Sequence, residues 1–219
     1  MTYTELCAAV SAYVENTFEA TELATFCQQA ERRTYHAVQL PALRKNVTGA
    51  LTISNKYLAC PSDFLATYSL AIVDPVTGEF SYLLNKDVNF LREAYPSPTA
   101  TSVPKYYALF GPQSGDEKEL TFIVAPTPDK AYAAELHYFF YPESISVAAS
   151  GRSWLGDNYD PVLFYGMLVE AYTFLKGEQD MLVLYNTKFN EAMQQLKRLG
   201  DGLERTDAYR SGQATIKVP

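Results

Sequence analysis

Apolar residues recur at helical spacing over the first forty residues and predict two helices. In the first helix, over residues 2–19, they fall on one face, and Thr2 and Glu5 fit a capping box that satisfies free backbone donors. Thr21 can cap the second helix, and Pro41 closes it because the residue before a proline avoids helical geometry. The apolar faces consist of Leu6, Ala9, Val10, Tyr13, Val14 and Phe18, and of Leu23, Phe26, Cys27, Ala30, Thr34 and Ala37.

The pattern changes between about residues 42 and 150, where Pro and Gly are frequent and apolar runs are short. Residues 65–84 predict a β-hairpin, because two strand-like runs flank the turn Asp74-Pro75-Val76-Thr77-Gly78. Alternation over 120–124 and 136–140 predicts a second hairpin, which turns at 127–130. Other expected elements are a strand at 50–53 and a short helix over 87–95 with Asp87 as its cap.

The last third returns to helical spacing. Asp160 and Pro161 suit the start of a helix that reaches Lys176 and stops at Gly177. A second helix covers 178–199, and Gly200 and Gly202 are expected to break it. Residues 203–219 have few large apolar side chains and no periodicity, which predicts a tail that does not fold by itself.

Helices at both ends and strands in the middle predict an α+β fold. In the simplest arrangement, residues 1–40 and 155–200 form one helical bundle and residues 41–154 form an inserted, antiparallel β-rich region. Residues 201–219 then form an extended C-terminal arm.

The net charge of −7 argues against tight binding to nucleic acid, because no segment is basic. A polybasic membrane patch and a long apolar segment are absent from the sequence too, so no membrane partner is expected. The chain holds 17 Tyr and 12 Phe against one Trp, a bias that suits either subunit interfaces or a tyrosine-rich sheet core. Cys7, Cys27 and Cys60 form an odd, scattered set, which indicates reduced thiols in a cytosolic setting.

No motif for nucleotide binding, hydrolysis or metal binding occurs in the chain. His36 falls near a helix end and His137 in a strand, and neither has a Cys or carboxylate at metal-ligand spacing. The polar run 154–160 suits a cation site poorly and a helix-capping loop with a buried Trp154 better. We therefore expect no catalytic residues, no cofactor and no metal.

From this run onward the sequence resembles bacteriophage adaptor (head–tail connector) proteins. The resemblance covers roughly residues 35–200, and the order of the motifs carries it more than any one of them. Cys60 stands where an aliphatic residue is expected, and the C-terminal tail matches no motif. The motifs are Tyr57-Leu58-Ala59-Cys60-Pro61-Ser62-Asp63-Phe64-Leu65, Ala94-Tyr95-Pro96-Ser97, Pro104-Lys105-Tyr106-Tyr107-Ala108, Val124-Ala125-Pro126-Thr127-Pro128, Trp154-Leu155, Asp157-Asn158-Tyr159, Leu163-x-Tyr165-Gly166-x-Leu168-x-Glu170-Ala171 and Phe174-Leu175-Lys176.

This resemblance implies a structural virion protein that is made in the host bacterial cytoplasm and sits in the neck of the phage. Such adaptors form a dodecameric ring below the portal, with the helical part towards the portal and the β-rich part towards the tail nozzle or tube. The C-terminal arm reaches along the portal, and DNA passes through the lumen without specific binding. An acidic chain suits a DNA conduit, because each phosphate contact would hold back the genome. By their chemistry, Tyr209, Arg210, Ile216 and Val218 are the expected portal contacts of the arm.

Three alternatives stay open from the sequence. The chain resembles neck components closely enough to be a head-completion or nozzle protein instead. It could carry a cell-wall hydrolase with acids such as Asp116, Glu117 and Glu119, although this run reads better as a solvated hairpin loop. A small-molecule binding module would need a closed pocket.

Overall fold

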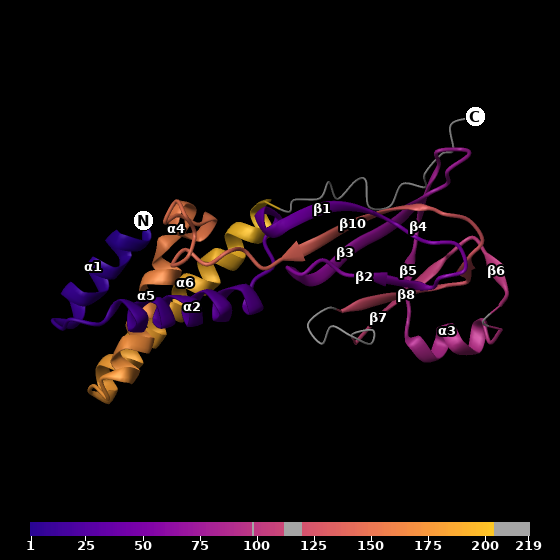
Figure 1. Ribbon diagram of the computed structural model, residues 1–219. Helices are drawn as coiled ribbons and strands as arrows, with labels where there is room; N and C mark the ends of the chain where they lie inside the picture. Colours follow the sequence, from indigo (N-terminus) through magenta and orange to yellow (C-terminus); the bar gives the residue numbers. More distant parts are fainter. Residues whose placement is uncertain (98, 112–119, 204–219) are drawn as a thin grey trace. The chain divides into compact units, whose positions relative to one another are not determined.

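The computed structural model describes residues 1–97, 99–111 and 120–203, and the chain divides into two compact units (Figure 1). One unit holds Met1–Ala42 and the chain from Pro142 onward, and it is helical. The other holds Leu43–Tyr141 and contains the strands, so the predicted α+β class is confirmed. Residues 142–154 group with the helices, although the sequence analysis placed them with the β-rich region.

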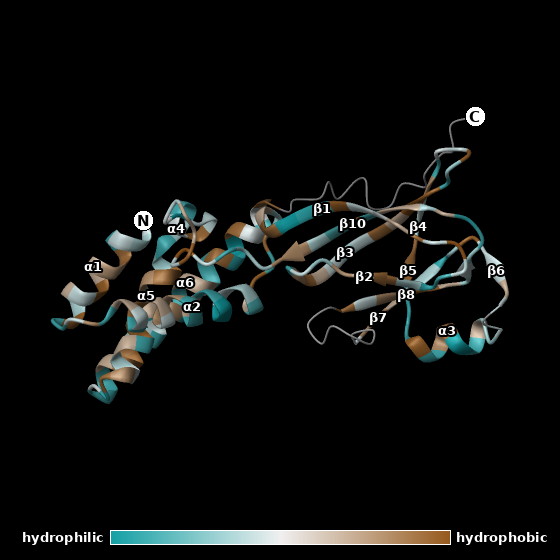
Figure 2. Ribbon diagram, viewed as in Figure 1, coloured by the Kyte–Doolittle hydropathy of each residue, from teal (hydrophilic) through white to brown (hydrophobic). Residues whose placement is uncertain are grey.

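The helical unit is organised around one central helix. Its elements are α1 (Tyr3–Val14), α2 (Ala20–Ala37), α4 (Trp154–Asn158), α5 (Asp160–Phe174) and α6 (Gln179–Leu203). Helix α5 packs against each of the other four, and its buried residues lie on all sides of the helix. Figure 2 accordingly shows α5 as mainly hydrophobic, as expected for a helix surrounded by other helices.

The start signals of these helices are only partly those expected. Thr2 and Glu5 form the predicted capping box of α1. In α2, however, Glu19 takes the cap position in place of Thr21, and its backbone N–H donates to the Glu22 carboxylate at 2.9 Å. Pro161 lies in the first turn of α5, as expected.

The expected break of the last helix at Gly200 and Gly202 is wrong, because α6 continues to Leu203. Gly200 is buried in the helix, and a Cβ there would lie 2.7 Å from Cδ2 of Leu40. The glycine therefore allows a neighbouring side chain to approach, a role that sequence alone cannot distinguish from a helix stop. Helix α5 ends at Phe174, two residues earlier than expected.

Two four-stranded sheets form the β-rich unit. We name the sheet with the strand order β1-β10-β3-β4 sheet A, and the sheet with the order β2-β8-β7-β5 sheet B. A short pair, β6 with β9, and one helix, α3, accompany them. The elements are β1 (Arg44–Ala50), β2 (Tyr57–Ala59), β3 (Phe64–Val73), β4 (Phe80–Tyr82), β5 (Leu84–Asn85), α3 (Val88–Ala94), β6 (Thr101–Ser102), β7 (Tyr106–Phe110), β8 (Thr121–Ala125), β9 (Thr127–Pro128) and β10 (Ala133–Phe140).

The predicted hairpin over 65–84 is confirmed, since β3 and β4 pair antiparallel. Asp87 caps α3 as expected, because its side chain accepts a hydrogen bond from the backbone of Asn89 at 2.7 Å. The strand expected at 50–53 lies earlier, at Arg44–Ala50.

The second predicted hairpin is wrong: β8 belongs to sheet B and β10 to sheet A, and the chain crosses between the sheets at 126–132. Every residue of β8 is buried. Phe122 and Val124 belong to the core cluster with residues of sheet A, whereas Ile123 and Ala125 pack with Leu91 of α3. A strand that is buried on both faces has apolar residues on both sides, so its sequence does not show which strand it pairs with. The prediction of a hairpin failed for this reason.

Candidate interaction surfaces

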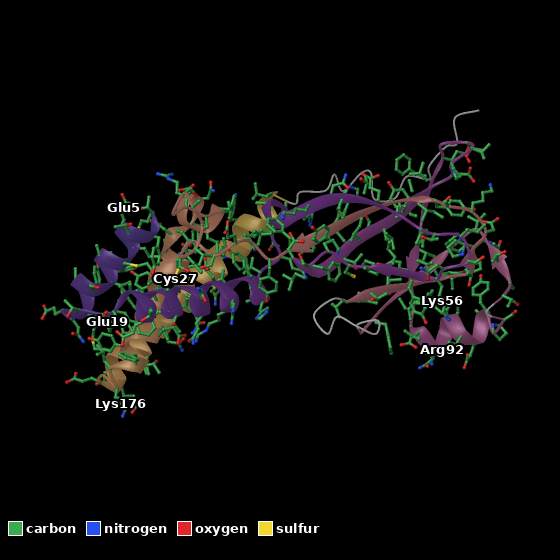
Figure 3. The ribbon with its side chains drawn as sticks, viewed as in Figure 1. Glu5, Glu19, Cys27, Lys56, Arg92 and Lys176 are labelled. Atoms are coloured by element: carbon green, nitrogen blue, oxygen red, sulfur yellow. The ribbon has the colours of Figure 1, made fainter. Side chains whose placement is uncertain are left out.

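The residues with catalytic potential have structural partners in this fold. His36 is exposed in the last turn of α2. His137 of β10 places Nδ1 3.0 Å from Oγ of Ser69 and Nε2 3.5 Å from Oε1 of Glu135. Across the described part of the chain, no three His, Cys, Asp or Glu side chains gather as metal ligands do. Burial raises the pKa of the Cys27 thiol, which lies among the helices in Figure 3, so this thiol stays protonated.

One carboxyl group is buried inside the helical unit. Glu31 of α2 is 3% exposed, and its Oε1 accepts a hydrogen bond from the backbone N–H of Ile145 at 2.9 Å. Burial raises the pKa of Glu31, although this hydrogen bond opposes the change. Gln28 on the same helix donates to Oγ of Ser146 at 3.2 Å. The carboxyl group therefore fastens the segment after Pro142 to α2.

The polar run 154–160 forms the short helix α4 and the start of α5, not a loop. Oγ of Ser153 caps α4 by accepting from the backbone of Gly156 at 3.1 Å. Asp157 pairs with Arg152 at 2.9 Å. Trp154 is only half-buried, whereas Leu155 is fully buried, so Leu155 anchors this helix in place of the expected indole. The run does not cap α5 as expected, because Tyr159 takes the cap position of that helix and its side chain makes no capping hydrogen bond.

Gly166 explains one of the motifs behind the family resemblance. A Cβ at this position of α5 would lie 2.7 Å from Cβ of Ala30 in α2 and 3.2 Å from Cε2 of Phe189 in α6. The glycine therefore sets how closely three helices approach one another. One turn further along α5, Glu170 forms an ion pair with Arg33 of α2.

Tyrosines lie both in the sheet core and on the surface of the protein. Tyr107, Tyr132 and Tyr138 belong to the buried cluster between the sheets. Tyr13 and Tyr82, in contrast, are 61% and 66% exposed. The tyrosine content thus reflects both a sheet core and an exposed aromatic surface.

The β3–β4 hairpin presents apolar side chains to the solvent on a rigid turn. Val76, Phe80 and Tyr82 are each more than half exposed. The Asp74 carboxylate holds the turn by accepting hydrogen bonds from the backbone of Val76 and Thr77 and by pairing with Lys130 at 3.3 Å. These contacts lower the pKa of Asp74, so the turn stays fastened at neutral pH. In Figure 1 the tip of this hairpin extends beyond the two sheets.

A groove of about 250 Å³ lies in the β-rich unit where the edge strands β1 and β2 meet. Its lining is mainly apolar and includes Val47, Leu58, Cys60 and Leu136. Strand β1 itself is exposed over its last six residues, and Figure 2 shows the beginning of this strand as hydrophilic.

A second, smaller cavity of about 60 Å³ lies between α3 and sheet B. Lys56 and Arg92 line it together with Tyr57 and Tyr95, and both cations are found near α3 in Figure 3. Lys56 also contacts the ring of Tyr57, with Nζ 5.4 Å from the ring centre.

The helical unit also exposes large apolar side chains. They include Tyr13 on α1, Phe174 at the end of α5, and Val183 and Leu184 near the start of α6. Phe174 packs against Phe26 of α2, with 5.5 Å between ring centres, yet remains 52% exposed. None of the described helices combines the length and the apolar character needed to cross a bilayer.

The comparison with protein families shows what kind of protein carries these surfaces. The family model described as SU10 adaptor protein matches residues 1–216. The chain belongs to the SU10 adaptor protein family. It is therefore a bacteriophage adaptor, a structural protein and a component of the virion. No curated protein matches the chain.

The family match is longer than the resemblance seen in the sequence. It includes the first 34 residues and most of the tail, where no motif was recognised. Tyr209, Arg210 and Ile216 fall within the match and Val218 lies just beyond it. All four lie outside the described residues, as do Asp116, Glu117 and Glu119 of the alternative reading.

Sequence reasoning missed the open sheet edges and the groove between β1 and β2. The uncharged run Phe80-Ser81-Tyr82-Leu83-Leu84 was the available signal. This run predicts the return strand of a hairpin. An apolar, uncharged strand at a sheet edge is also a sign that the strand pairs with a strand of another chain.

Proposed function

We propose that this adaptor forms a ring, with twelve subunits, that joins the portal of the phage to its tail. The observation that carries the proposal is the family match over residues 1–216. Exposed apolar side chains on both units support it, because each subunit of a closed ring needs two different complementary surfaces. In this ring the helical unit faces the portal, and the β-rich unit faces the tail nozzle or tube.

The ring lumen is the path of the DNA. The net charge of −7 supports a conduit without specific binding. An acidic protein makes few contacts with DNA phosphates, so it does not slow the passage of the genome.

Residues 203–219 act as an arm that binds the portal through Tyr209, Arg210, Ile216 and Val218. The inclusion of residues up to 216 in the family match supports a role for this segment in the adaptor function. Two aliphatic side chains, one aromatic ring and one guanidinium provide both apolar contact and hydrogen-bond donors.

The arm is tested by truncation after Leu203, which keeps α6 whole. The truncated chain should keep its far-ultraviolet circular dichroism and its melting temperature but lose binding to the purified portal. A full-length control with the order of residues 204–219 scrambled should lose binding as well. Portal binding by the truncated chain at full affinity would exclude the arm from the contact.

The ring is tested by imaging the same mixture in negative stain. Rings on one end of the portal are expected. Binding to purified nozzle or tube protein without binding to the portal would instead make the chain a component further down the tail.

A further inference from the structure

Among the described residues, sheet A has two open edges that fit each other. Its four strands are antiparallel throughout, so β1 at one edge and β4 at the other run in opposite directions. A second copy placed beside the first, edge to edge, would therefore continue the same antiparallel alternation.

The backbone of β1 offers hydrogen-bonding groups at its outer edge. Leu51 donates its N–H to the carbonyl of Tyr132 at 2.8 Å, which shows that this residue faces β10. Because strand residues alternate in direction, Gly49 and Val47 also face β10. Asn46, Thr48 and Ala50 then point their N–H and C=O groups away from the sheet.

The same reasoning applies to β4. Leu83 donates to the carbonyl of Leu70 at 2.9 Å, so residue 83 faces β3, and by alternation Ser81 faces β3 as well. Phe80 and Tyr82 consequently point their backbone groups outward. Strand β4 carries no charged side chain, proline or bulge of the kind that normally blocks pairing at an edge.

Symmetry favours the pairing of unlike edges. Pairing β1 with β1, or β4 with β4, uses the same edge of both copies and closes after two copies. Pairing β4 with β1 of a neighbour uses two different edges of each copy, as a closed ring of more than two subunits requires.

We propose that β4 of one adaptor subunit pairs antiparallel with β1 of the next, with Ser81 opposite Gly49 of the neighbouring copy. In this register the neighbouring copy is not shifted along the strand direction, because one row across sheet A contains Gly49, Ala134, Ile72 and Ser81. This inference rests on the proposed ring and names the surfaces that would close it.

In this register the side chains match in size. Ser81 and Gly49, both small, meet on the inner face, next to the groove between β1 and β2. On the outer face, Phe80 and Tyr82 lie opposite Ala50 and Thr48 of the neighbour, so each aromatic ring covers a smaller side chain.

The pairing is too short to hold a free dimer. Phe80 and Tyr82 pair with only two of the three outward residues of β1, which provides at most four hydrogen bonds. So small a contact falls short of the roughly 1,200 Å² buried in stable interfaces. The strands therefore pair when the subunits are already held beside each other on the portal.

Cysteine cross-linking tests the register. Ser81 and Gly49 would form a non-hydrogen-bonded pair with Cα atoms about 4.5 Å apart, within the range of a disulfide. Gly49 accepts a side chain, since the nearest atom to its Cβ would be Cδ1 of Leu58 at 4.0 Å. Of the native cysteines, Cys27 and Cys60 are buried.

The double variant S81C/G49C, oxidised on the portal and run on a non-reducing gel, should give a ladder of linked multimers, whereas each single variant should give none.

Images showing rings while no ladder forms would overturn the pairing and leave the ring intact; absence of rings would overturn the ring itself. A ladder from S81C/V47C in its place would overturn the register. Dimers of S81C alone would overturn the head-to-tail order.

A backbone test is independent of the cysteines. Tyr82→Pro removes the outward N–H without breaking a β3–β4 hydrogen bond, while Tyr82→Val keeps that donor and also lacks the aromatic ring. Both variants should melt within a few degrees of each other. Ring assembly by the proline variant should need roughly tenfold more protein than assembly by the valine variant. Equal assembly by the two folded variants would contradict strand pairing.

Discussion

Replacing Gly166 with alanine tests how the helical unit is packed. Alanine is a better helix former than glycine by about 1 kcal/mol, so in a loosely packed helix the change would stabilise the protein. At Gly166, however, the added Cβ would lie 2.7 Å from Cβ of Ala30, about 1 Å inside normal contact distance.

The magnitude follows from two opposing effects. Overpacking a tight core costs about 1–3 kcal/mol, and the structure offers little relief because Cε2 of Phe189 is already 3.2 Å from the new Cβ. After subtraction of the helix propensity, Gly166→Ala should lower the free energy of unfolding by up to about 2 kcal/mol.

Exchanging the two small residues sharpens the test. Ala30→Gly alone should cost about 1–2 kcal/mol, from helix propensity and one lost buried methyl group. In the double variant A30G/G166A the nearest atom of residue 30 to the new Cβ is Cα, at 3.5 Å, and only the contact with Phe189 at 3.2 Å stays tight. The double variant should therefore be more stable than the sum of the single effects by about 2 kcal/mol.

Urea denaturation followed by circular dichroism at 222 nm measures all three variants, and an unchanged slope would show that only stability has changed. Gly202→Ala in α6 is the matched control, because no described atom lies within 4 Å of its Cβ position. The control should be neutral or slightly stabilised. Stabilisation of Gly166→Ala to the same extent, or strict additivity in the double variant, would refute the close approach of α2 and α5.

Three further substitutions test other parts of the molecule by the same denaturation assay. Phe122→Ala empties the centre of the sheet core, where this ring is fully buried, and should cost about 3–5 kcal/mol. Glu31→Gln keeps the acceptor for Ile145 but removes the charge. Because the pKa of Glu31 is raised in the folded chain, its contribution to stability is present at low pH and is lost as the pH rises. From about pH 4 upward, the free energy of unfolding of the variant should therefore increase relative to that of the parent chain, by at most ~1.4 kcal/mol per pH unit. Asp63→Asn should cost stability at pH 7 and less at pH 3, because the advantage of the charge is lost as the pH falls through the lowered pKa of the folded chain. Burial opposes ionisation of this carboxyl, but hydrogen bonds from Lys45 and Tyr138 lower its pKa.

Each of these results has a clear opposite. Near-normal stability of the alanine variant at position 122 would place this ring outside the core. A constant difference between the Glu31→Gln variant and the parent chain across the pH range would mean that the carboxyl has the same pKa in the folded and unfolded chains. Equal losses for the Asp63→Asn variant at both pH values would show that the charge of Asp63 contributes nothing.

The sequence predicted best the elements with a strong local signal. The capping box of Thr2 and Glu5, the turn at Asp74 and the cap at Asp87 depend on neighbours in the chain, and all three are confirmed. Their geometry depends on short hydrogen bonds whose partners are within three residues.

Long-range packing explains the failures. The alternation over 120–140 looks like a hairpin, yet β8 and β10 belong to different sheets because β3, from earlier in the chain, pairs with β10. Gly200 resembles a helix stop, but it accommodates Leu40, more than 150 residues away in the chain. No local pattern carries such information.

The interaction surfaces divide in the same way. Exposed aromatic side chains could be expected from the tyrosine content, but not which of them are exposed. Whether Phe80 and Tyr82 lie at an open edge depends on the strand order of sheet A, which only the folded chain shows.

Native mass spectrometry of the purified portal mixed with this adaptor tests the central claim most directly. The account predicts a complex heavier than the portal by twelve copies of the 24.5 kDa chain, roughly 290 kDa, without intermediate species at saturation. A portal mass that stays unchanged at saturating adaptor, or one that rises by a single copy, would contradict the ring.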